Sequence, residues 1–371
     1  MALRTEAPFR ADHVGSLLRP ARLVEARDKK KAGQISAEDL RKVEDDAIRE
    51  VVKLQEDLGL EGITDGEFRR TFWHLDFLEQ FANVTVIPPK VGVKFHTHEG
   101  DVEFAPPGLR VDGKLKRTHP IFLDHFKYLK TVVKKTPKQT IPSPSIMHFR
   151  GGRGAISDKA YPDMAEFYAD LGRVYNEEVT DLIAAGCRYL QIDEVNFAYL
   201  CDPKLRQQVK SIGEDPDKLP HTYAKLLNDV IKGRPKDMRV CMHLCRGNFK
   251  SAWVAEGGYE PVAEVLFNEI EIDGYFMEYD DPRSGNFEPL RFLPKGKTVV
   301  LGLVTTKLGA LENKSDLKRR IEQAAKYAPL DQLALSPQCG FASTVEGNNV
   351  SLMDEIAKLR LIVEVAKEVW G

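Results

Sequence analysis

Short apolar runs separated by amphipathic stretches recur along this chain. Eight of the runs are rich in β-branched and aromatic residues and are bounded by turn-forming residues, as strands are. They span residues 13–17, 62–65, 139–148, 189–193, 239–245, 275–279, 299–304 and 332–336. This pattern predicts eight short, largely buried strands spread over the whole sequence.

Helical periodicity fills most of the intervals between these runs. Apolar residues three to four positions apart indicate helices, for example at Phe167, Leu171 and Val174, and again at Leu359 and Val363. Parallel strands need crossover helices, and eight strand-helix units can close on themselves. We therefore expect an α/β fold of the (β/α)8 TIM-barrel type.

One segment, residues 84–117, interrupts this rhythm. Its apolar and polar residues alternate around turn signals such as Asp112-Gly113, which is typical of an antiparallel hairpin. The sequence contains no internal repeat and no low-complexity linker. We expect a single barrel domain over residues 1–371, with residues 84–117 as a hairpin insertion within it.

Composition and charge narrow the range of partners. The 371 residues include 54 basic and 56 acidic side chains, so the net charge is -2 and nucleic-acid binding lacks its electrostatic basis. No stretch approaches the roughly 20 apolar residues of a membrane span, and residues 1–10 lack the apolar run of a signal peptide. We expect a cytoplasmic protein that acts on small molecules and binds neither nucleic acid nor membranes.

The five cysteines are candidates for metal binding rather than for disulfides, because their number is odd and the chain has no export signal. His243 and Cys245 are two residues apart at the end of one predicted strand, so both side chains face the same side. Glu278 and Cys339 stand at the ends of two further strands. Strand ends converge at the carboxyl face of a barrel, and two thiolates, an imidazole and a carboxylate suit tetrahedral zinc.

Residues of these types also have ordinary structural roles. A buried histidine or cysteine taken alone belongs more often to a core than to a metal site. Cys241 shares the parity of Cys245 but lies roughly 13 Å deeper along the strand, so we interpret it as barrel core. A second pair, His96 and His98, lies in the predicted hairpin with no cysteine nearby and is interpreted as solvated surface.

Six motifs follow one another along nearly the whole chain. They are His-Val-Gly-Ser-Leu-Leu-Arg-Pro (13–20), Thr-Asp-Gly-Glu-Phe-Arg-Arg (64–70), Gln-Ile-Asp-Glu (191–194), His-Leu-Cys (243–245), Glu278 and Ser-Pro-Gln-Cys-Gly (336–340). Taken together and in this order, they resemble the catalytic C-terminal barrel of the cobalamin-independent methionine synthases.

The resemblance implies a methyltransferase in which the four strand-end residues hold one zinc ion and homocysteine is methylated to methionine. It also implies that Ser16, Glu67 and Asp193 hold the amino-acid end of homocysteine. The chemistry agrees, because acids pair with an ammonium group, a serine can donate to a carboxylate, and zinc lowers the pKa of a thiol. Each of the three also has a structural interpretation as a turn or cap residue. Neighbouring charged residues remain alternatives, namely Asp65, Glu194, Arg19, Arg69 and Arg70.

The sequence departs from the family at the places that serve the methyl donor. Residues 145–150 replace a segment that usually carries a Trp beneath the pterin, and residues 303–308 replace one with a His that helps to protonate the leaving group. Lys307 or His148 would have to take over that protonation. We also expect no counterpart within residues 1–371 of the additional N-terminal barrel that full-length members carry.

These departures leave the donor open between methyltetrahydrofolate and a methylcorrinoid. A corrinoid protein is therefore an open partner, and so is a second copy of the chain in a homo-oligomer. Two alternative functions keep the zinc: alkylation of another small thiol, including epoxide opening, and zinc binding without catalysis. The uroporphyrinogen decarboxylases share the barrel but need no zinc, and fold alone does not decide between such functions.

Overall fold

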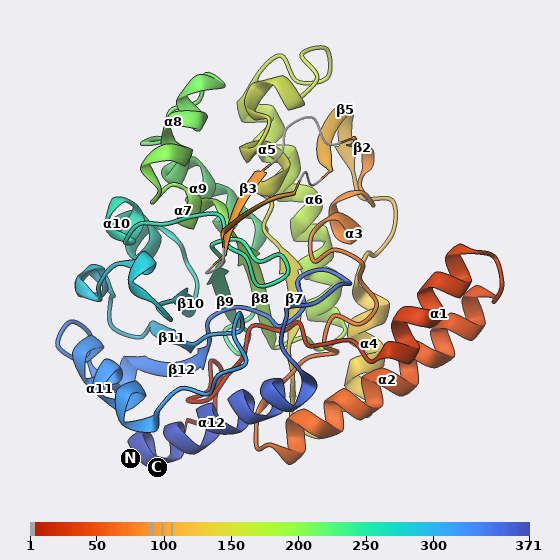
Figure 1. Ribbon diagram of the computed structural model, residues 1–371. Helices are drawn as coiled ribbons and strands as arrows, with labels where there is room; N and C mark the ends of the chain where they lie inside the picture. The colour runs from red at the N-terminus through yellow and green to blue at the C-terminus, as the bar shows by residue number, and fades with distance from the viewer. Residues whose placement is uncertain (1–3, 89–92, 98–99, 105–106) are drawn as a thin grey trace.

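The computed structural model describes residues 4–88, 93–97, 100–104 and 107–371, and its centre is a sheet of parallel strands enclosed by helices (Figure 1). The main sheet has the order β12-β11-β10-β9-β8-β7. The strands are β1 (Gly62–Ile63), β2 (Ala82–Ile87), β3 (Val93–Thr97), β4 (Gly100–Phe104), β5 (Gly108–Lys116), β6 (Thr136–Pro137), β7 (Gln139–Pro142), β8 (Tyr189–Glu194), β9 (Arg239–Leu244), β10 (Gly274–Glu278), β11 (Thr298–Val304) and β12 (Leu333–Pro337).

Two further segments close the main sheet into a barrel. β6 runs into β7, and β1 pairs with β6 in parallel, which extends the sheet beyond β7. At the opposite edge the extended segment 10–17 lies along β12, because the Asp12 N–H donates to the Leu335 carbonyl (3.1 Å). The same segment reaches the far side, where the Leu17 N–H donates to the Gly66 carbonyl (3.1 Å). With the six strands of the main sheet these make eight, so the predicted (β/α)8 barrel is confirmed.

The helices form the outer layer. They are α1 (Ala21–Lys31), α2 (Ala37–Asp57), α3 (Leu75–Leu78), α4 (Leu123–Val132), α5 (Ile146–Phe149), α6 (Met164–Ala184), α7 (Asn196–Tyr199), α8 (Pro203–Ser211), α9 (Leu219–Val230), α10 (Glu260–Glu269), α11 (Lys314–Ala324) and α12 (Leu352–Trp370), with 3-10 turns η1 (Gly152–Ala155), η2 (Pro282–Ser284), η3 (Glu288–Phe292) and η4 (Leu330–Gln332). Among the described residues, no helix is long and apolar enough to cross a membrane.

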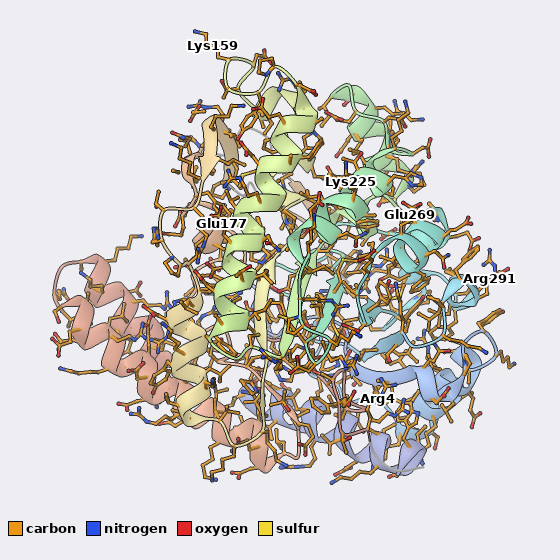
Figure 2. The ribbon with its side chains drawn as sticks, turned by 180° about the vertical axis from the view of Figure 1, so that it is seen from behind. Arg4, Lys159, Glu177, Lys225, Glu269 and Arg291 are labelled. Carbon is orange, nitrogen blue, oxygen red and sulfur yellow. The ribbon has the colours of Figure 1, made fainter. Side chains whose placement is uncertain are left out.

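The sequence explains why these helices cover the barrel with one face. In α6 the predicted apolar positions Phe167, Leu171 and Val174 are all buried, and the Asp163 side chain caps the helix by accepting from the Ala165 N–H. Figure 2 shows the opposite faces, where charged side chains of α6, α9 and α10 project away from the barrel. The helices therefore cover the sides of the barrel, and functional side chains can reach a substrate only at the ends of the strands.

Two predicted strands differ from the structure. The strand predicted at 139–148 ends at Pro142, and residues after it form α5, because Pro142 and Pro144 offer no N–H groups to continue a ladder. The segment predicted as a strand at 13–17 is extended but has no ladder, and its neighbour Ala11 makes only an isolated bridge to β12. Gly15 has a φ of 138°, which interrupts regular pairing there.

The hairpin segment contains two antiparallel pairs, an outer pair β2-β5 and an inner pair β3-β4. The predicted turn at Asp112-Gly113 is wrong, because both residues lie in β5, where the register with β2 shifts at a bulge. β3 lies across the barrel in Figure 1 and is held there by backbone hydrogen bonds. The His96 N–H donates to the Trp253 carbonyl (2.7 Å), and the Trp253 N–H donates back (2.9 Å).

Candidate active site

The ends of β9, β10 and β12 bring four potential metal ligands together, with β11 between β10 and β12 in the sheet. His243 is near the end of β9 and Cys245 directly follows it, Glu278 is the last residue of β10, and Cys339 follows β12. All four side chains are buried, and their ligand atoms lie within 4.8 Å of one another. The strand periodicity explains this convergence, because His243 and Cys245 point to the same side of β9.

The spacing of the four ligand atoms fits a tetrahedral ion. The two sulfur atoms are 3.5 Å apart, and the His243 Nε2 is 3.9 Å from the Glu278 Oε1. A metal at about 2.3 Å from each thiolate would place the sulfurs about 3.8 Å apart in a tetrahedron. Neither ring nitrogen of His243 has a hydrogen-bond partner in the described part of the chain, which an ion would explain.

Neighbouring groups hold the Glu278 carboxylate in place. The Gln338 side-chain amide donates to Glu278 Oε2 (2.9 Å), and the Arg246 backbone N–H donates to Oε1 (3.1 Å). Burial raises the pKa of Glu278 to about 7, and the nearby Cys339 adds to this rise. The buried ammonium of Lys307 acts in the opposite direction and donates to the Asn248 Oδ1 (3.3 Å).

The two thiols behave as one coupled pair. The hydrogen bond from Cys245 holds the pKa of the Cys339 thiol well below its ordinary value, and the same contact raises the pKa of Cys245. A thiolate and a carboxylate that share a buried site repel each other, and a cation bound between them would remove that repulsion. Geometry and charge therefore both fit a metal ion.

The serine and the two acids predicted for substrate binding line the same pocket as His243 and the two cysteines. Asp193 is buried near the end of β8, where the Gln191 side chain donates to it (2.6 Å). Burial raises the pKa of Asp193 to about 7, and the negative charge of Glu67 adds to the rise. A positively charged group would be stabilised between these two acids.

Local backbone geometry explains how Glu67 and Ser16 reach the pocket. Glu67 has a φ of 60°, which L residues rarely adopt, and its N–H is held by the Asp65 carboxylate (2.9 Å). The Glu67 carboxylate accepts from the Thr140 hydroxyl (2.8 Å). Ser16 packs directly against Gly340, where a Cβ would overlap the serine hydroxyl.

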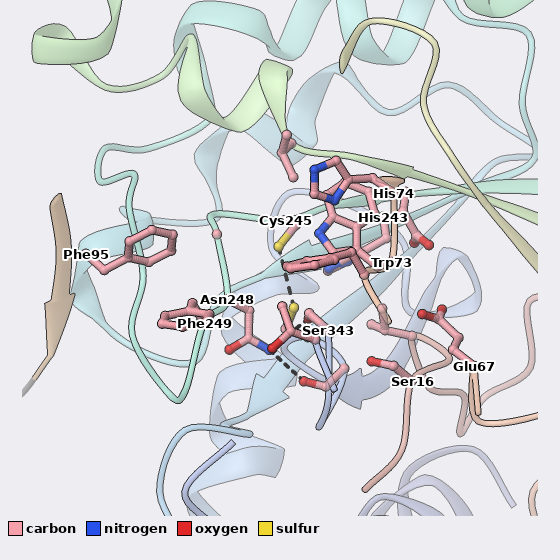
Figure 3. Close-up of a pocket in the computed structure, with 18 of the residues that line it drawn as sticks. Ser16, Glu67, Trp73, His74, Phe95, His243, Cys245, Asn248, Phe249 and Ser343 are labelled. Carbon is pink, nitrogen blue, oxygen red and sulfur yellow. Dashed lines mark hydrogen bonds between the residues drawn. The ribbon is translucent and has the colours of Figure 1, made fainter. Parts of the chain in front are cut away.

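The pocket has two chemically different sides, as Figure 3 shows. Ser16 and Glu67 lie on one side, Phe95 and Phe249 lie on the other, and His243 and Cys245 lie between them. The complete lining consists of Val14, Ser16, Glu67, Phe72, Trp73, His74, Phe95, Arg150, Asp193, Val195, Tyr199, His243, Cys245, Gly247, Asn248, Phe249, Cys339, Gly340, Ser343 and Thr344. A thiol bound beside the cysteines would therefore face an apolar, aromatic space.

Several of these lining residues were not found from the sequence. Phe72, Trp73 and His74 come one residue after the Thr-Asp-Gly-Glu-Phe-Arg-Arg motif, and three rings in succession were the available signal. Phe95 comes from β3 and meets Phe249 at 5.7 Å between ring centres. Arg150 is the residue that ends α5, the short helix that the structure has in place of the second half of the strand predicted at 139–148. The hairpin thus contributes to the pocket wall.

Other sequence candidates lie outside the pocket lining. His148 is buried and bonded to the Tyr223 hydroxyl (2.9 Å) and to Glu214 (3.2 Å). His96 pairs with Asp101 (2.7 Å), and His98 lies outside the described residues. Cys241 is buried in the barrel interior, as predicted.

The charged neighbours proposed as alternatives are engaged in structural contacts. Glu194 accepts from Ser143 and Ser145, and Arg69 pairs with Glu44 and Asp45. Arg19 donates to the carbonyls of Glu67, Arg70, Ala342 and Thr344, and Asp65 accepts from the Glu67 N–H. Arg70 donates to Thr140 and also pairs with the Glu67 carboxylate (3.5 Å), so it contacts one of the proposed substrate-binding acids.

A pocket lined by a buried histidine, two buried cysteines and two buried acids at the carboxyl face of the strands is typical of a (β/α)8-barrel enzyme. More specifically, the chain belongs to the family described as the cobalamin-independent synthase, catalytic domain, which matches residues 9–368. This confirms the resemblance inferred from the six motifs. The enzyme is a methyltransferase, and its family supports methylation of homocysteine.

Known proteins and solved structures resemble this chain over nearly its whole length. The uncharacterized protein YxjH of Bacillus subtilis is 46% identical over 368 residues, which are 98% of this chain and 96% of YxjH. The methionine synthase of Sulfolobus acidocaldarius is 23% identical and covers 88% of this chain and 84% of its own. A solved structure from Listeria monocytogenes, assigned as a vitamin-B12 independent methionine synthase, is 37% identical with a TM-score of 0.78 and covers 99% of this chain and 100% of its own.

Proposed function

We propose that this enzyme transfers a methyl group to the thiol of homocysteine, giving methionine, with zinc held by His243, Cys245, Glu278 and Cys339. The observation that carries the proposal is the convergence of these four ligand atoms within 4.8 Å of one another, three of them from residues that line the pocket, His243, Cys245 and Cys339. When bound, zinc lowers the pKa of the substrate thiol and keeps it as a thiolate at neutral pH. We take residues 1–371 as one barrel unit with residues 84–117 inserted, acting in the cytoplasm.

The surrounding side chains would orient homocysteine. Glu67 and Asp193 are buried acids on one side of the pocket, and both suit the substrate ammonium group. The Ser16 hydroxyl can donate to the substrate carboxylate. A thiol without an ammonium group could pair with neither acid. Among the described residues, the Glu67 carboxylate would keep only its contacts with Arg70 (3.5 Å) and Thr140 (2.8 Å), and Asp193 its contact with Gln191 (2.6 Å), so the two acids favour an amino-acid thiol over a thiol coenzyme.

The proposal leaves two candidates for the compound that donates the methyl group. Methyltetrahydrofolate and a methylcorrinoid are both compatible with a metal-bound thiolate as nucleophile, and a corrinoid protein would be the partner in the second case. His148 lies outside the pocket lining, and Lys307 is directed to Asn248. Neither residue is therefore assigned as the acid that protonates a leaving group.

The test combines metal content with X-ray absorption at the zinc edge. Purified enzyme should contain one zinc per chain, and added homocysteine should introduce one further sulfur ligand. Cys339→Ser should lose zinc and turnover together, whereas the control Cys187→Ser, at a buried cysteine outside the pocket, should keep both. An unchanged absorption spectrum on adding homocysteine, or full turnover by Cys339→Ser, would refute the proposal.

A further inference from the structure

Strand β11 supplies none of the four ligands, although it lies between two of the strands that do. β10 ends with Glu278, β12 is followed by Cys339, and β11 pairs with both strands (Figure 1). Glu278 lies opposite Gly302 of β11 in the ladder. A Cβ on Gly302 would come within 2.8 Å of the Gln338 Cα and within 2.9 Å of the Met277 carbonyl oxygen. Because glycine stands there, the chain at Gln338 passes close to β11, and its side chain reaches Glu278.

The Gln338 side chain is buried and makes hydrogen bonds at both ends of its amide. The amide nitrogen donates to the Glu278 Oε2 (2.9 Å), and the amide oxygen accepts from the Thr306 hydroxyl (2.7 Å) and from the Thr306 N–H (3.3 Å). A carboxylate can only accept and a backbone N–H can only donate, so these partners fix the direction in which the amide points. Thr306 comes two residues after β11 and is itself buried. The end of β11 is therefore connected to Glu278 through two buried side chains.

The two oxygens of the Glu278 carboxylate have different surroundings. Oε1 is the oxygen that lies 3.9 Å from the His243 Nε2. Oε2 accepts from Gln338, and the Arg283 guanidinium is 3.7 Å away from it. Arg283 is the more distant of these two neighbours, because it pairs with Asp280 at 2.9 Å. The Gln338 amide is therefore the group that holds Oε2 most directly, while Oε1 faces the other ligands.

Gln338 and Thr306 contact neither a metal nor a substrate in this arrangement. Neither residue is one of the four potential ligands, and neither is among the residues that line the pocket. Partners that bind a metal ligand in this way fix its orientation, and their loss typically lowers metal affinity about 10- to 100-fold. Any effect of these two residues on the chemistry must therefore pass through Glu278.

We propose that Gln338 and Thr306 are positioning residues for the metal site. Gln338 holds the Oε2 of Glu278 so that the carboxylate offers Oε1 to the ion, and Thr306 keeps the Gln338 amide in the orientation that does this. Without the hydrogen bond from Gln338, the carboxylate is free to turn and both of its oxygens compete for the ion. The inference rests on the proposed function for the presence of zinc, and it goes beyond it by assigning roles to two residues on the far side of a ligand.

The test measures zinc affinity by competition with a chromophoric chelator, and records the visible absorption spectrum of the Co²⁺-loaded enzyme, which reports ligand geometry without turnover. Gln338→Met keeps the length of the side chain but removes the amide, and should lower zinc affinity about 10- to 100-fold. Thr306→Val removes the hydroxyl that holds the amide and should lower zinc affinity several-fold. Thr306→Ser keeps that hydroxyl and should retain the wild-type affinity. The Co²⁺ spectrum should change in the first two variants and match the wild type in the third.

A double variant tests whether the two residues act in series. If Thr306 acts through Gln338, the variant Gln338→Met with Thr306→Val should bind zinc as weakly as Gln338→Met alone, and no more weakly. The matched control is Thr298→Val, at a buried threonine on the opposite end of the same strand, whose hydroxyl accepts from Arg4 (2.5 Å). It should keep the zinc affinity and the Co²⁺ spectrum of the wild type. If Gln338→Met does not fold, the difference between Thr306→Val and Thr306→Ser decides the question.

A purely structural role predicts a different pattern, in which urea unfolding shows lower stability but the folded variants keep the zinc affinity and Co²⁺ spectrum of the wild type. That pattern, or additive losses in the double variant, would overturn the inference. If the wild type takes up zinc and a sulfur ligand from homocysteine but all variants bind zinc equally, the positioning role falls and the proposed function stands. If homocysteine adds no sulfur ligand but zinc affinity still depends on Gln338 and is retained in Thr306→Ser, the positioning role stands and the homocysteine assignment falls.

Discussion

At the scale of single residues, the absence of a side chain at Gly340 determines where Ser16 can lie. A Cβ on Gly340 would overlap the Ser16 hydroxyl, so Gly340→Ala should displace that side chain from the pocket. Loss of one hydrogen bond to the substrate carboxylate should raise the KM for homocysteine roughly tenfold. Zinc content should be retained, because the ligand side chains themselves are unchanged.

Steady-state kinetics with zinc analysis would check this prediction. Gly154→Ala is the appropriate control, since a Cβ there meets nothing within 4 Å. An unaltered KM in Gly340→Ala would show that Ser16 does not contact homocysteine.

A second residue-scale prediction concerns Glu355, a buried carboxyl on α12. Its Oε2 accepts from the Leu18 N–H (2.8 Å), its Oε1 has no partner among the described residues, and burial raises its pKa to about 8. A raised pKa means that its contribution to stability is fully present below the ordinary value of 4.5 and is lost as pH rises through about 8. Glu355→Gln carries no charge and should escape this loss.

Urea unfolding at about pH 5 and about pH 9 would measure the difference. The free energy of unfolding should fall with pH more steeply in the wild type than in Glu355→Gln, by on the order of a few kcal/mol. Glu38→Gln, at an exposed carboxylate, should follow the wild type. Parallel pH dependences in all three proteins would contradict the assignment.

At the scale of elements, the β3-β4 hairpin is part of the pocket. Backbone hydrogen bonds between His96 and Trp253 fix β3 over the barrel, and Phe95 then contributes an aromatic wall with Phe249. Phe95→Ala should weaken binding of a neutral aromatic compound, 2-naphthamide, measured by calorimetric titration into the enzyme, about tenfold through lost apolar contact. The control Val86→Ala changes a half-exposed residue of β2 that lies outside the lining and should have no effect. Equal affinities in both variants would place the probe elsewhere.

The elements also show which parts of the site could be predicted from sequence. The convergence of His243, Cys245 and Glu278 follows from strand periodicity and from the rule that barrel chemistry lies at strand ends. Phe95 could not be found in this way, because β3 docks through backbone groups, which any sequence supplies. Arg150 was hidden for a different reason: the prolines before it end β7 and turn a predicted strand into α5, which carries Arg150 to the rim.

At the scale of the whole molecule, a buried ion pair fixes the segment that closes the barrel. The Lys138 ammonium lies 3.1 Å from the Asp12 carboxylate, and both side chains are inaccessible to solvent. Asp12 also accepts from the Tyr189 hydroxyl (2.7 Å). Segment 10–17 also carries Ser16 to the pocket. The contacts that close the barrel therefore also bring Ser16 into the same pocket as Glu67 and Asp193.

Lys138→Met should therefore destabilise the entire barrel, since it leaves the Asp12 carboxylate buried without its cation, at a cost of about 3 to 5 kcal/mol. The double variant Asp12→Asn with Lys138→Met removes both charges and should recover much of that loss. Urea unfolding followed by circular dichroism and by tryptophan fluorescence should show coincident transitions, because closure couples all strands. If Lys138→Met unfolds like the wild type, or if the double variant is the less stable of the two, charge pairing does not hold the barrel closed.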